Sequence, residues 1–275
     1  MSKMSQKFST ITNIAKYTIA DEVRQKSFLV MFVVSVIFVF LIRGCYQGNY
    51  MINGQELNAE AVVATVSKIT FHIITVTLML VTALLSMRVF KRDRDEGMQS
   101  CIFSKPITRM QYVMGKILGL WVLSSFFMFV LHAIIFLTVL LRLNIVMPGY
   151  LAASVLCSLN LLFVVIAVLL LSLMMPDIAA FLCVMGIGII SFAADWIFAT
   201  THIPLLHMQS GWTGWETIYY LWPKLSGLQH FASLFIVGFN GYPRFAYIYP
   251  LINVIFYCLI LGMILFWRFR NEDII

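Results

Sequence analysis

Six long apolar segments, separated by short polar stretches, make up most of the hydrophobic pattern of this chain. They cover residues 27–42, 69–87, 117–141, 151–175, 178–198 and 249–269. A helix of about 20 apolar residues crosses the roughly 30 Å hydrocarbon core of a bilayer. Each segment therefore predicts a transmembrane helix, the first of them short. The whole pattern predicts an all-α integral membrane protein with six transmembrane helices.

The stretch before the first span is too polar to cross a membrane, but its apolar residues recur at helical spacing. The residues concerned are Ile11, Ile14, Ala15 and Thr18, with the cations Lys16, Arg24 and Lys26 among polar neighbours. This spacing predicts an amphipathic helix in the inner interface, its cations toward the lipid headgroups. A solvated N-terminal helix is the alternative. The chain then divides into this helix, residues 1–26, and a single six-span domain, residues 27–275.

A long outer segment, residues 199–248, joins the fifth and sixth spans and is rich in aromatic residues. Trp212, Trp215, Tyr219, Tyr220 and Trp222 fall within eleven residues. Trp and Tyr favour the headgroup region of a membrane because one end of each side chain is apolar and the other is polar. The apolar run 228–239 that follows has twelve residues, too few to span. It predicts a re-entrant or interfacial helix, and the whole segment a lid against the outer leaflet.

Composition supports a membrane protein and excludes a soluble one. Of the 275 residues, 61% are hydrophobic and 11% are charged, whereas a soluble domain carries about 25% charged residues. The net charge of +7 could indicate a nucleic-acid partner. Its basic residues, however, sit in short segments between apolar runs rather than on one folded face, so no nucleic acid is expected.

The distribution of Lys and Arg predicts the orientation of the chain. With the N-terminus inside, the inner segments hold 14 of the 19 basic residues and the outer segments hold 5. Cytoplasmic loops carry the excess of positive charge in membrane proteins. Both termini are therefore expected in the cytoplasm, as an even number of spans requires.

No pattern in the chain indicates an enzyme. The five cysteines show no CxxC or other metal-ligand spacing, and we find no nucleophile–base pair or HExxH motif. The chain is therefore expected to be neither a catalyst nor a metal protein.

The inner loop, residues 88–116, carries the most informative pattern. It holds seven Lys or Arg residues and three acids around an apolar patch formed by Met98, Cys101, Ile102 and Phe103. Mixed charge with an apolar patch favours a short surface helix that docks on a cytoplasmic partner. The alternative is an ordinary positive-inside loop that anchors the second and third spans.

This loop resembles the signature region of ABC-2 type transporter permeases. An acidic-Gly pair (Glu96-Gly97) leads a short helix, a small-residue/Pro motif follows at 104–109, and Gly115-Lys116 opens the third span. The basic-acidic tail at 269–273 and the stretch 222–227 are also similar to segments of these permeases. The resemblance in span number and order covers the whole chain, and its detail is concentrated in residues 88–119.

The resemblance implies a permease subunit that pairs with a second copy or a paralogue and binds two separate P-loop ATPase subunits. It implies an exporter in the bacterial plasma (inner) membrane, in contact with membrane lipids. The chain itself has no GxxxxGK[ST] motif, so no cofactor is expected on it, and ATP and Mg²⁺ belong to the partner. The resemblance places these residues on or beside a coupling helix: Glu96, Gly97, Met98, Ile102 and Phe103, followed by Lys105, Pro106 and Arg109.

Polar residues within the spans are the candidates for a translocation path, because charges there are costly and usually functional. The candidates are Asp195, Asn160, His132 and His72. The alternatives are an interfacial anchor for Asp195, hydrogen-bonded packing for the two histidines and an interhelical hydrogen bond for Asn160. The glycine pairs 115/119 and 186/188 predict close helix packing.

Two other classes of protein stay open at this point. One is the membrane component of an ATPase-driven system that assembles or matures an extracytoplasmic protein. The other is an ATP-independent channel or secondary transporter, which should carry charges near the middle of its spans. The scarcity of such charges argues against this second class.

Overall fold

The computed structural model describes residues 3–42, 44, 46, 51–52, 55–56, 59–104, 107–201, 219–237 and 244–271. The main helices in these ranges are α1 (Lys3–Arg24), α2 (Lys26–Ile42), α3 (Ala59–Ser86), α4 (Val89–Asp95), α5 (Met98–Phe103), α6 (Arg109–Leu143), α7 (Pro148–Ser172), α8 (Asp177–Thr201), α10 (Leu225–Val237) and α11 (Arg244–Arg270). Two short strands, β1 (Met51–Ile52) and β2 (Gln55–Glu56), pair antiparallel. The predicted all-α membrane fold is confirmed.

Five stretches of helix in the described part of the chain are long and apolar enough to cross a membrane. They are α6, α7, α8, α11 and the stretch formed by α3 and α4. A sixth candidate is the pair of α1 and α2, whose axes bend by 72°. With 17 residues, α2 is about 26 Å long. The six predicted spans are present if α2 counts as the short first one.

Several spans extend further than hydropathy indicated. α3 begins at Ala59 and α6 at Arg109, well before the apolar runs that open at residues 69 and 117. A capping box fixes the start of α6: the Gln111 amide N–H donates to Thr108 Oγ1, and the Thr108 N–H donates to Gln111 Oε1. Hydropathy therefore locates the membrane-buried part of a span, and the cap locates its end.

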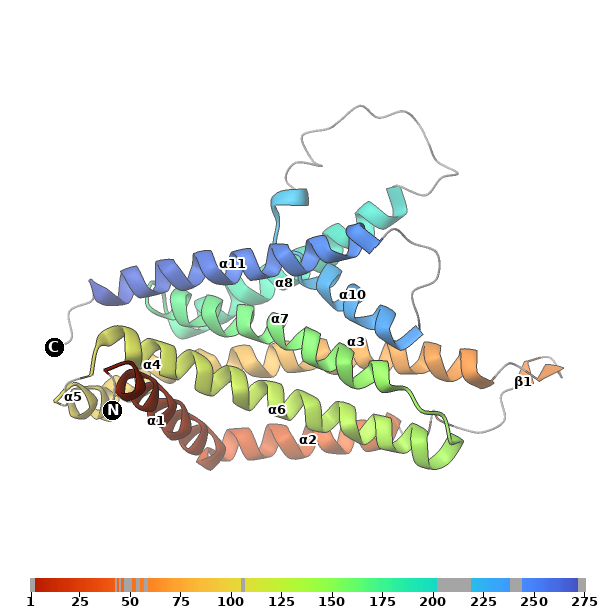
Figure 1. Ribbon diagram of the computed structural model, residues 1–275, viewed down its shortest axis with the longest axis horizontal. Coiled ribbons are helices and arrows are strands. Elements are labelled where there is room, and N and C mark those ends of the chain that lie inside the picture. The colour runs from red at the N-terminus through yellow and green to blue at the C-terminus, as the bar shows by residue number, and fades with distance from the viewer. Residues whose placement is uncertain are drawn as a thin grey trace.

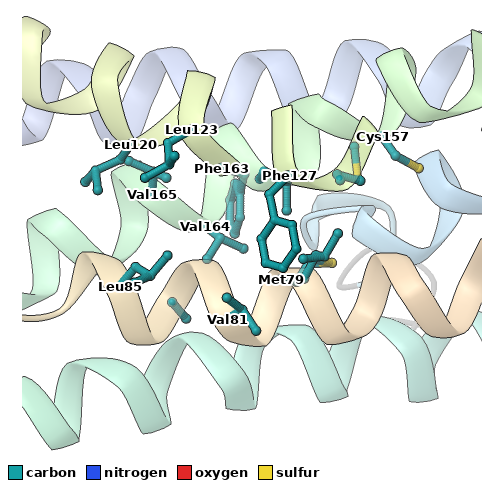
Figure 2. Close-up of a cluster of buried hydrophobic side chains, with 14 of the residues drawn as sticks. Met79, Val81, Leu85, Leu120, Leu123, Phe127, Cys157, Phe163, Val164 and Val165 are labelled. Atoms are coloured by element: carbon teal, nitrogen blue, oxygen red, sulfur yellow. The ribbon is translucent and has the colours of Figure 1, made fainter. Parts of the chain in front are cut away.

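The core is built around α7, whose stretch 163–170 is buried on all sides, whereas Val155 nearer its start is 63% exposed. Residues 163–170 of α7 are each 5% exposed or less, as expected for a helix that is apolar all round. Figure 2 shows three residues of this helix, Phe163, Val164 and Val165, packed between α3 and α6. The contacting side chains of α3 are Met79, Val81 and Leu85, and those of α6 are Leu120, Leu123 and Phe127. α7 thus sets the positions of the helices around it.

Two glycines bring α1 into close contact with α6. A Cβ atom added at Gly115 would lie 2.6 Å from Cβ of Ile14, and one at Gly119 would lie 2.8 Å from Cβ of Thr18. The predicted apolar face of α1 therefore packs against protein. The prediction of close packing is confirmed for this glycine pair. It is wrong for Gly186 and Gly188, where an added Cβ would meet open space.

The two ends of the helical bundle are formed by different elements. The start of α1, the end of α11, and α4 and α5 gather at one end, which we call the inner end; β1 lies at the opposite, outer end (Figure 1). The common position of the first and last helix ends agrees with an even number of spans.

α10 begins deep in the bundle. The Nδ2 amide of Asn160, in the middle of α7, donates to the Leu225 carbonyl at 3.0 Å, and α10 runs from there toward the outer end (Figure 1). The helix starts at Leu225 rather than at residue 228, and its re-entrant or interfacial position stays a prediction. Trp212 and Trp215 of the aromatic run lie outside the described residues.

Candidate functional site

The inner loop folds into two short helices joined by a glycine turn. Glu96 ends α4, and Gly97 adopts a φ of +68° before α5 begins at Met98. Glycine takes up this left-handed conformation without the steric cost that a Cβ imposes. The Gly97 N–H donates to the Arg94 carbonyl at 3.1 Å, so the turn also satisfies a carbonyl at the end of α4. The sequence pair Glu96-Gly97 therefore sets the angle between α4 and α5.

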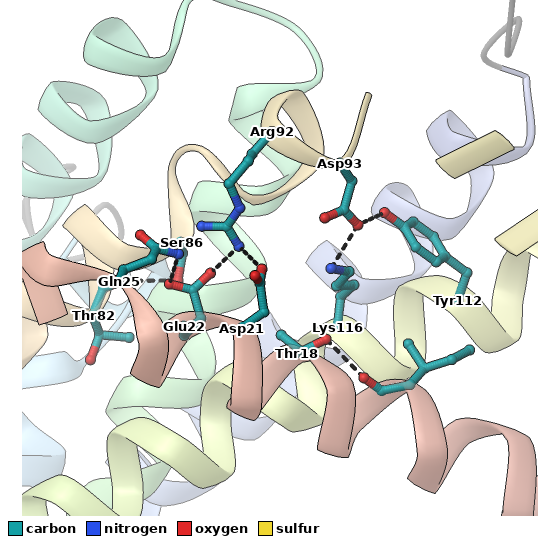
Figure 3. A network of polar contacts seen from close by, with 11 residues as sticks. Thr18, Asp21, Glu22, Gln25, Thr82, Ser86, Arg92, Asp93, Tyr112 and Lys116 are labelled. Atoms are coloured by element: carbon teal, nitrogen blue, oxygen red, sulfur yellow. Dashed lines mark hydrogen bonds and ion pairs between the residues drawn. The ribbon is translucent and has the colours of Figure 1, made fainter. Parts of the chain in front are cut away.

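A buried ion pair joins α4 to α6. Lys116 Nζ lies 2.6 Å from Asp93 Oδ2, and the two side chains are 0% and 1% exposed. The Tyr112 hydroxyl donates to the same carboxylate (Figure 3). Lys116 Nζ also faces the ring of Tyr17 of α1, 5.4 Å from its centroid. Opposite charges and a phenol thus compensate one another where water is excluded.

The neighbouring residue, Arg92, joins α4 to α1. Its Nη2 lies 2.5 Å from Asp21 Oδ2 and 2.7 Å from Glu22 Oε1 (Figure 3). Glu22 is fully buried and also accepts a hydrogen bond from Gln25 Nε2 at 2.8 Å. A guanidinium that bridges two carboxylates fixes position as well as charge, because its donors have a rigid, planar geometry.

Two further residues of α4 contact the remaining helices of the inner end. The ring of Phe90 packs 5.2 Å from that of Phe269 of α11 and 6.2 Å from that of Tyr112 of α6. Lys91 lies 3.9 Å from Asp177 at the start of α8, although it is largely exposed. Residues 90–93, which we call the α4 hub, therefore touch α1, α6, α8 and α11 with four consecutive side chains.

The structure places the predicted coupling residues on and around α5. Glu96 and Gly97 are exposed, and Met98 and Ile102 are half-buried. Arg109 begins α6, where its Nη1 donates to the carbonyls of Phe269 (3.4 Å) and Arg270 (2.8 Å). Phe103 ends α5. Its side chain, together with Lys105 and Pro106, lies outside the described part of the structure.

A second polar cluster surrounds Asp195 near the end of α8. Its Oδ1 accepts from the Tyr219 hydroxyl at 2.9 Å and lies 3.3 Å from Nζ of Lys224, which is 3% exposed. The Lys224 amide donates to Oδ1 of Asn253 in α11. This cluster fixes the start of α10 between α8 and α11.

Two of the other three predicted translocation residues also contact α10, and His132 makes packing contacts. His132 Nδ1 lies 2.9 Å from Ser154 Oγ, and its ring stacks on Phe71 at 4.9 Å. The His72 carbonyl accepts from Gln229 Nε2 at 3.0 Å. Asn160 holds the start of α10, as described above. The structure thus brings Asp195 and Asn160 together at the start of α10, through Lys224 and Leu225, and leaves the two histidines out of that contact.

An apolar pocket of about 520 Å³ opens between α3, α7, α8 and the start of α10. Its lining includes Leu80, Val184, Gly188, Phe192, Trp196 and Leu225. None of the four predicted translocation residues is part of this lining, although Trp196 follows Asp195 and Leu225 receives the Asn160 hydrogen bond. The open space at Gly188 belongs to this pocket.

The sequence pattern did not predict the contacts that the α4 hub makes with other helices. From the sequence, Lys116 is expected at the end of the inner loop, where the third span opens, yet this residue lies two turns inside α6 and is fully buried. The signal was present, because Tyr112 and Lys116 stand four residues apart and so share one helix face. Glu22 and Arg92 gave no local signal, since their contact joins residues 70 positions apart.

The fold and this inner end define a helical integral membrane protein in which the loop between the second and third spans is tied to the other helices. Residues 12–203 match the model of the ABC-2 family transporter protein, a stretch that runs from α1 to α8 and includes α4 and α5. The chain belongs to this family, as its resemblance to ABC-2 permeases predicted, and is a membrane component of an ABC transporter. The comparison with curated proteins found no match.

Proposed function

We propose that this chain is the permease subunit of an ATP-driven exporter in the bacterial plasma membrane. In this proposal a separate cytoplasmic P-loop ATPase binds ATP and Mg²⁺ and docks on α5 and the exposed Glu96-Gly97 turn. A second permease, either the same chain or a paralogue, completes the transporter. Export is the direction that the family resemblance implies.

The observation that carries the proposal is the α4 hub. α5 follows α4 through a turn fixed by Gly97, so a force on α5 acts on α4. Four consecutive residues of α4 then contact four other helices, two of them through ion pairs with largely buried side chains. An ordinary loop that only anchors two spans would not need such contacts. The hub has the connections required to move several spans together.

The physical consequence is a rigid transmission of movement. Separating Asp93 from Lys116 would leave an uncompensated charge in a buried site, which costs several kcal/mol. The helices at the inner end are therefore expected to shift with α4 rather than to release it. A movement of α5 would then tilt α1, α6, α8 and α11 as a body, the rigid-body kind of transition.

The experiment that tests this function is affinity purification of the tagged protein in mild detergent from cells that express its native locus. A stoichiometric P-loop ATPase among the co-purifying proteins supports the proposal. Substitution of the α5 residue Ile102 by Asp should remove that ATPase. Val146→Asp, the same kind of change at an exposed residue of the loop between α6 and α7, should retain it. A preparation without any ATPase would favour a channel or secondary transporter instead.

The direction of transport needs a separate measurement. With the ATPase bound, inside-out membrane vesicles given external ATP should accumulate the substrate if the protein is an exporter. Accumulation that occurs without ATP would contradict the proposed coupling.

A further inference from the structure

A second pocket of the inner end lies on the outside of the bundle, between the start of α6 and the end of α11. Its volume is about 370 Å³, and its lining includes two cations, Arg109 and Arg270. These are the first residue of α6 and the last residue of α11. The hydrogen bonds of Arg109 Nη1 to the carbonyls of Phe269 and Arg270 hold its guanidinium at the pocket.

The rest of the pocket wall is apolar and continues onto the membrane-facing surface. Met110, Val113, Phe266 and Trp267 contribute to the lining. Met110 is 61% exposed and Trp267 is 67% exposed. Trp at the end of a span favours the headgroup level, so the arginines lie where lipid phosphates are found and the apolar wall lies where acyl chains begin.

We propose that this pocket binds an anionic glycerophospholipid, with its phosphate between Arg109 and Arg270 and its acyl chain along Met110, Val113 and Phe266. Arginine recognises phosphate through paired N–H donors. Basic pockets between spans on the cytoplasmic side are typical sites for anionic headgroups. The site thus has a counterpart for each part of the lipid: two arginines for the phosphate and an apolar groove for the acyl chain.

The apolar wall distinguishes a lipid from the other occupants. A soluble phosphate or nucleotide would gain nothing from the exposed Met110 and Trp267 side chains. A docked protein would need a broad surface, whereas this pocket sits between the ends of two spans. The exposed apolar residues Leu259, Met263 and Trp267 continue along α11 toward the bilayer, so the groove opens into the lipid phase.

The site is also connected to the α4 hub. Phe269, which forms part of the pocket wall, packs on Phe90 of the hub and on Tyr112 at 5.7 Å. A lipid in the pocket would therefore press on the same aromatic cluster that joins α4 to α11. Lipid binding itself does not depend on the proposed transport function.

The test is native mass spectrometry of the purified protein in detergent, with phosphatidylglycerol or phosphatidylcholine of the same chain length added. The expected result is preferential retention of one phosphatidylglycerol molecule. Arg270→Gln should weaken this retention about fivefold, and Arg109→Gln with Arg270→Gln about 25-fold, since each arginine near an anionic surface contributes about 1 kcal/mol. Arg270→Gln keeps the main-chain carbonyl that Arg109 contacts, so this variant should fold even if the double variant does not.

The matched control is Arg142→Gln, which removes an exposed arginine at the other end of α6. It should leave the retention of phosphatidylglycerol unchanged. Equal retention of the two lipids by the unmodified protein, or equal losses in Arg142→Gln and Arg270→Gln, would overturn the proposal. Displacement of the lipid by millimolar inorganic phosphate would also overturn it, because the site would then recognise phosphate alone.

Discussion

At the scale of single residues, the Asp93–Lys116 pair is the feature with the largest energetic consequence. Both side chains are buried, so each charge depends on the other for compensation. Buried ion pairs add little net stability, because desolvation offsets most of their attraction. Breaking one is costly nevertheless, since the remaining charge stays buried. The pair therefore specifies how α4 docks on α6 more than it stabilises the fold.

This asymmetry makes a prediction for Asp93. Asp93→Ala should lower the free energy of unfolding by about 3–5 kcal/mol, because Lys116 is left unpaired. The double variant Asp93→Leu with Lys116→Leu should recover most of that loss. Asp95→Ala, which removes an exposed acid from the same helix, should change stability by no more than about 0.5 kcal/mol. SDS titration of the purified protein in mixed micelles measures all three, and a stable Asp93→Ala variant would contradict the pairing.

The family resemblance located part of the candidate site. The resemblance to ABC-2 permeases places the Glu96-Gly97 pair ahead of a short helix, and in the structure α5 does begin directly after Gly97. The positive φ of Gly97 is a finding of the structure that the sequence pattern did not predict. The coupling roles that the resemblance assigns to residues from Glu96 to Arg109 all stay predictions. The position of Lys116 inside a helix could have been inferred from its four-residue spacing to Tyr112. Arg92 could not be placed, because its partner Glu22 comes from a helix distant in sequence. Pairing of this kind depends on packing that no single segment encodes.

At the scale of elements, the contact of α1 with α6 depends on the absence of side chains at two positions. Gly115 and Gly119 let the backbones approach, as small residues do between membrane helices. Ile14 and Thr18 fill the space that a side chain would occupy. The spacing of apolar residues predicted the helix, but it could not show whether lipid or protein covers its apolar face.

Gly119→Leu should displace α1 from α6. The added Cβ alone would lie 2.9 Å from the Ala15 carbonyl oxygen and 2.8 Å from Cβ of Thr18, so neither helix can accommodate it without moving. Overpacking of this kind costs about 1–3 kcal/mol. Gly186→Leu is the control, because open space surrounds that position. Thermal aggregation in detergent should separate the two variants, and equal midpoints would show that the α1 contact is not formed.

The turn between α4 and α5 makes a second prediction at this scale. Gly97→Pro cannot adopt a φ of +68°, because proline holds φ near −65°. Gly97→Ala can adopt it at a cost of about 1–2 kcal/mol. If α5 is the docking helix, the proline variant should insert into the membrane normally and lose partner-stimulated ATP hydrolysis, while the alanine variant loses part of it. Normal stimulation of the proline variant would contradict the role of the turn.

At the scale of the whole molecule, the number of spans could be predicted because it depends on local hydrophobicity. The arrangement could not, since it depends on contacts such as Arg92 with Asp21, which join residues 71 positions apart. The start of α10 beside Asn160 is another such contact. A twelve-residue apolar run indicated a helix of this length but not its neighbours. Hydropathy therefore defines the membrane topology, and buried polar contacts define how the helices assemble.

In the proposed function, α5 binds the ATPase and the α4 hub passes its movement to the other helices, so different substitutions should affect these two steps. Ile102→Asp in α5 should abolish co-purification of the ATPase, because it places a charge on a half-buried apolar residue of the docking helix. Arg92→Ala in the hub should retain the ATPase but reduce its stimulation, because α4 loses its contacts with Asp21 and Glu22. Arg88→Ala, the change of an exposed arginine just before α4, should affect neither. The amount of bound ATPase and the rate of ATP hydrolysis, measured on the same preparations, show whether binding and stimulation are lost separately. If Arg92→Ala and Ile102→Asp lose binding and stimulation together, α4 and α5 form one docking surface, and the hub does not act as a transmission.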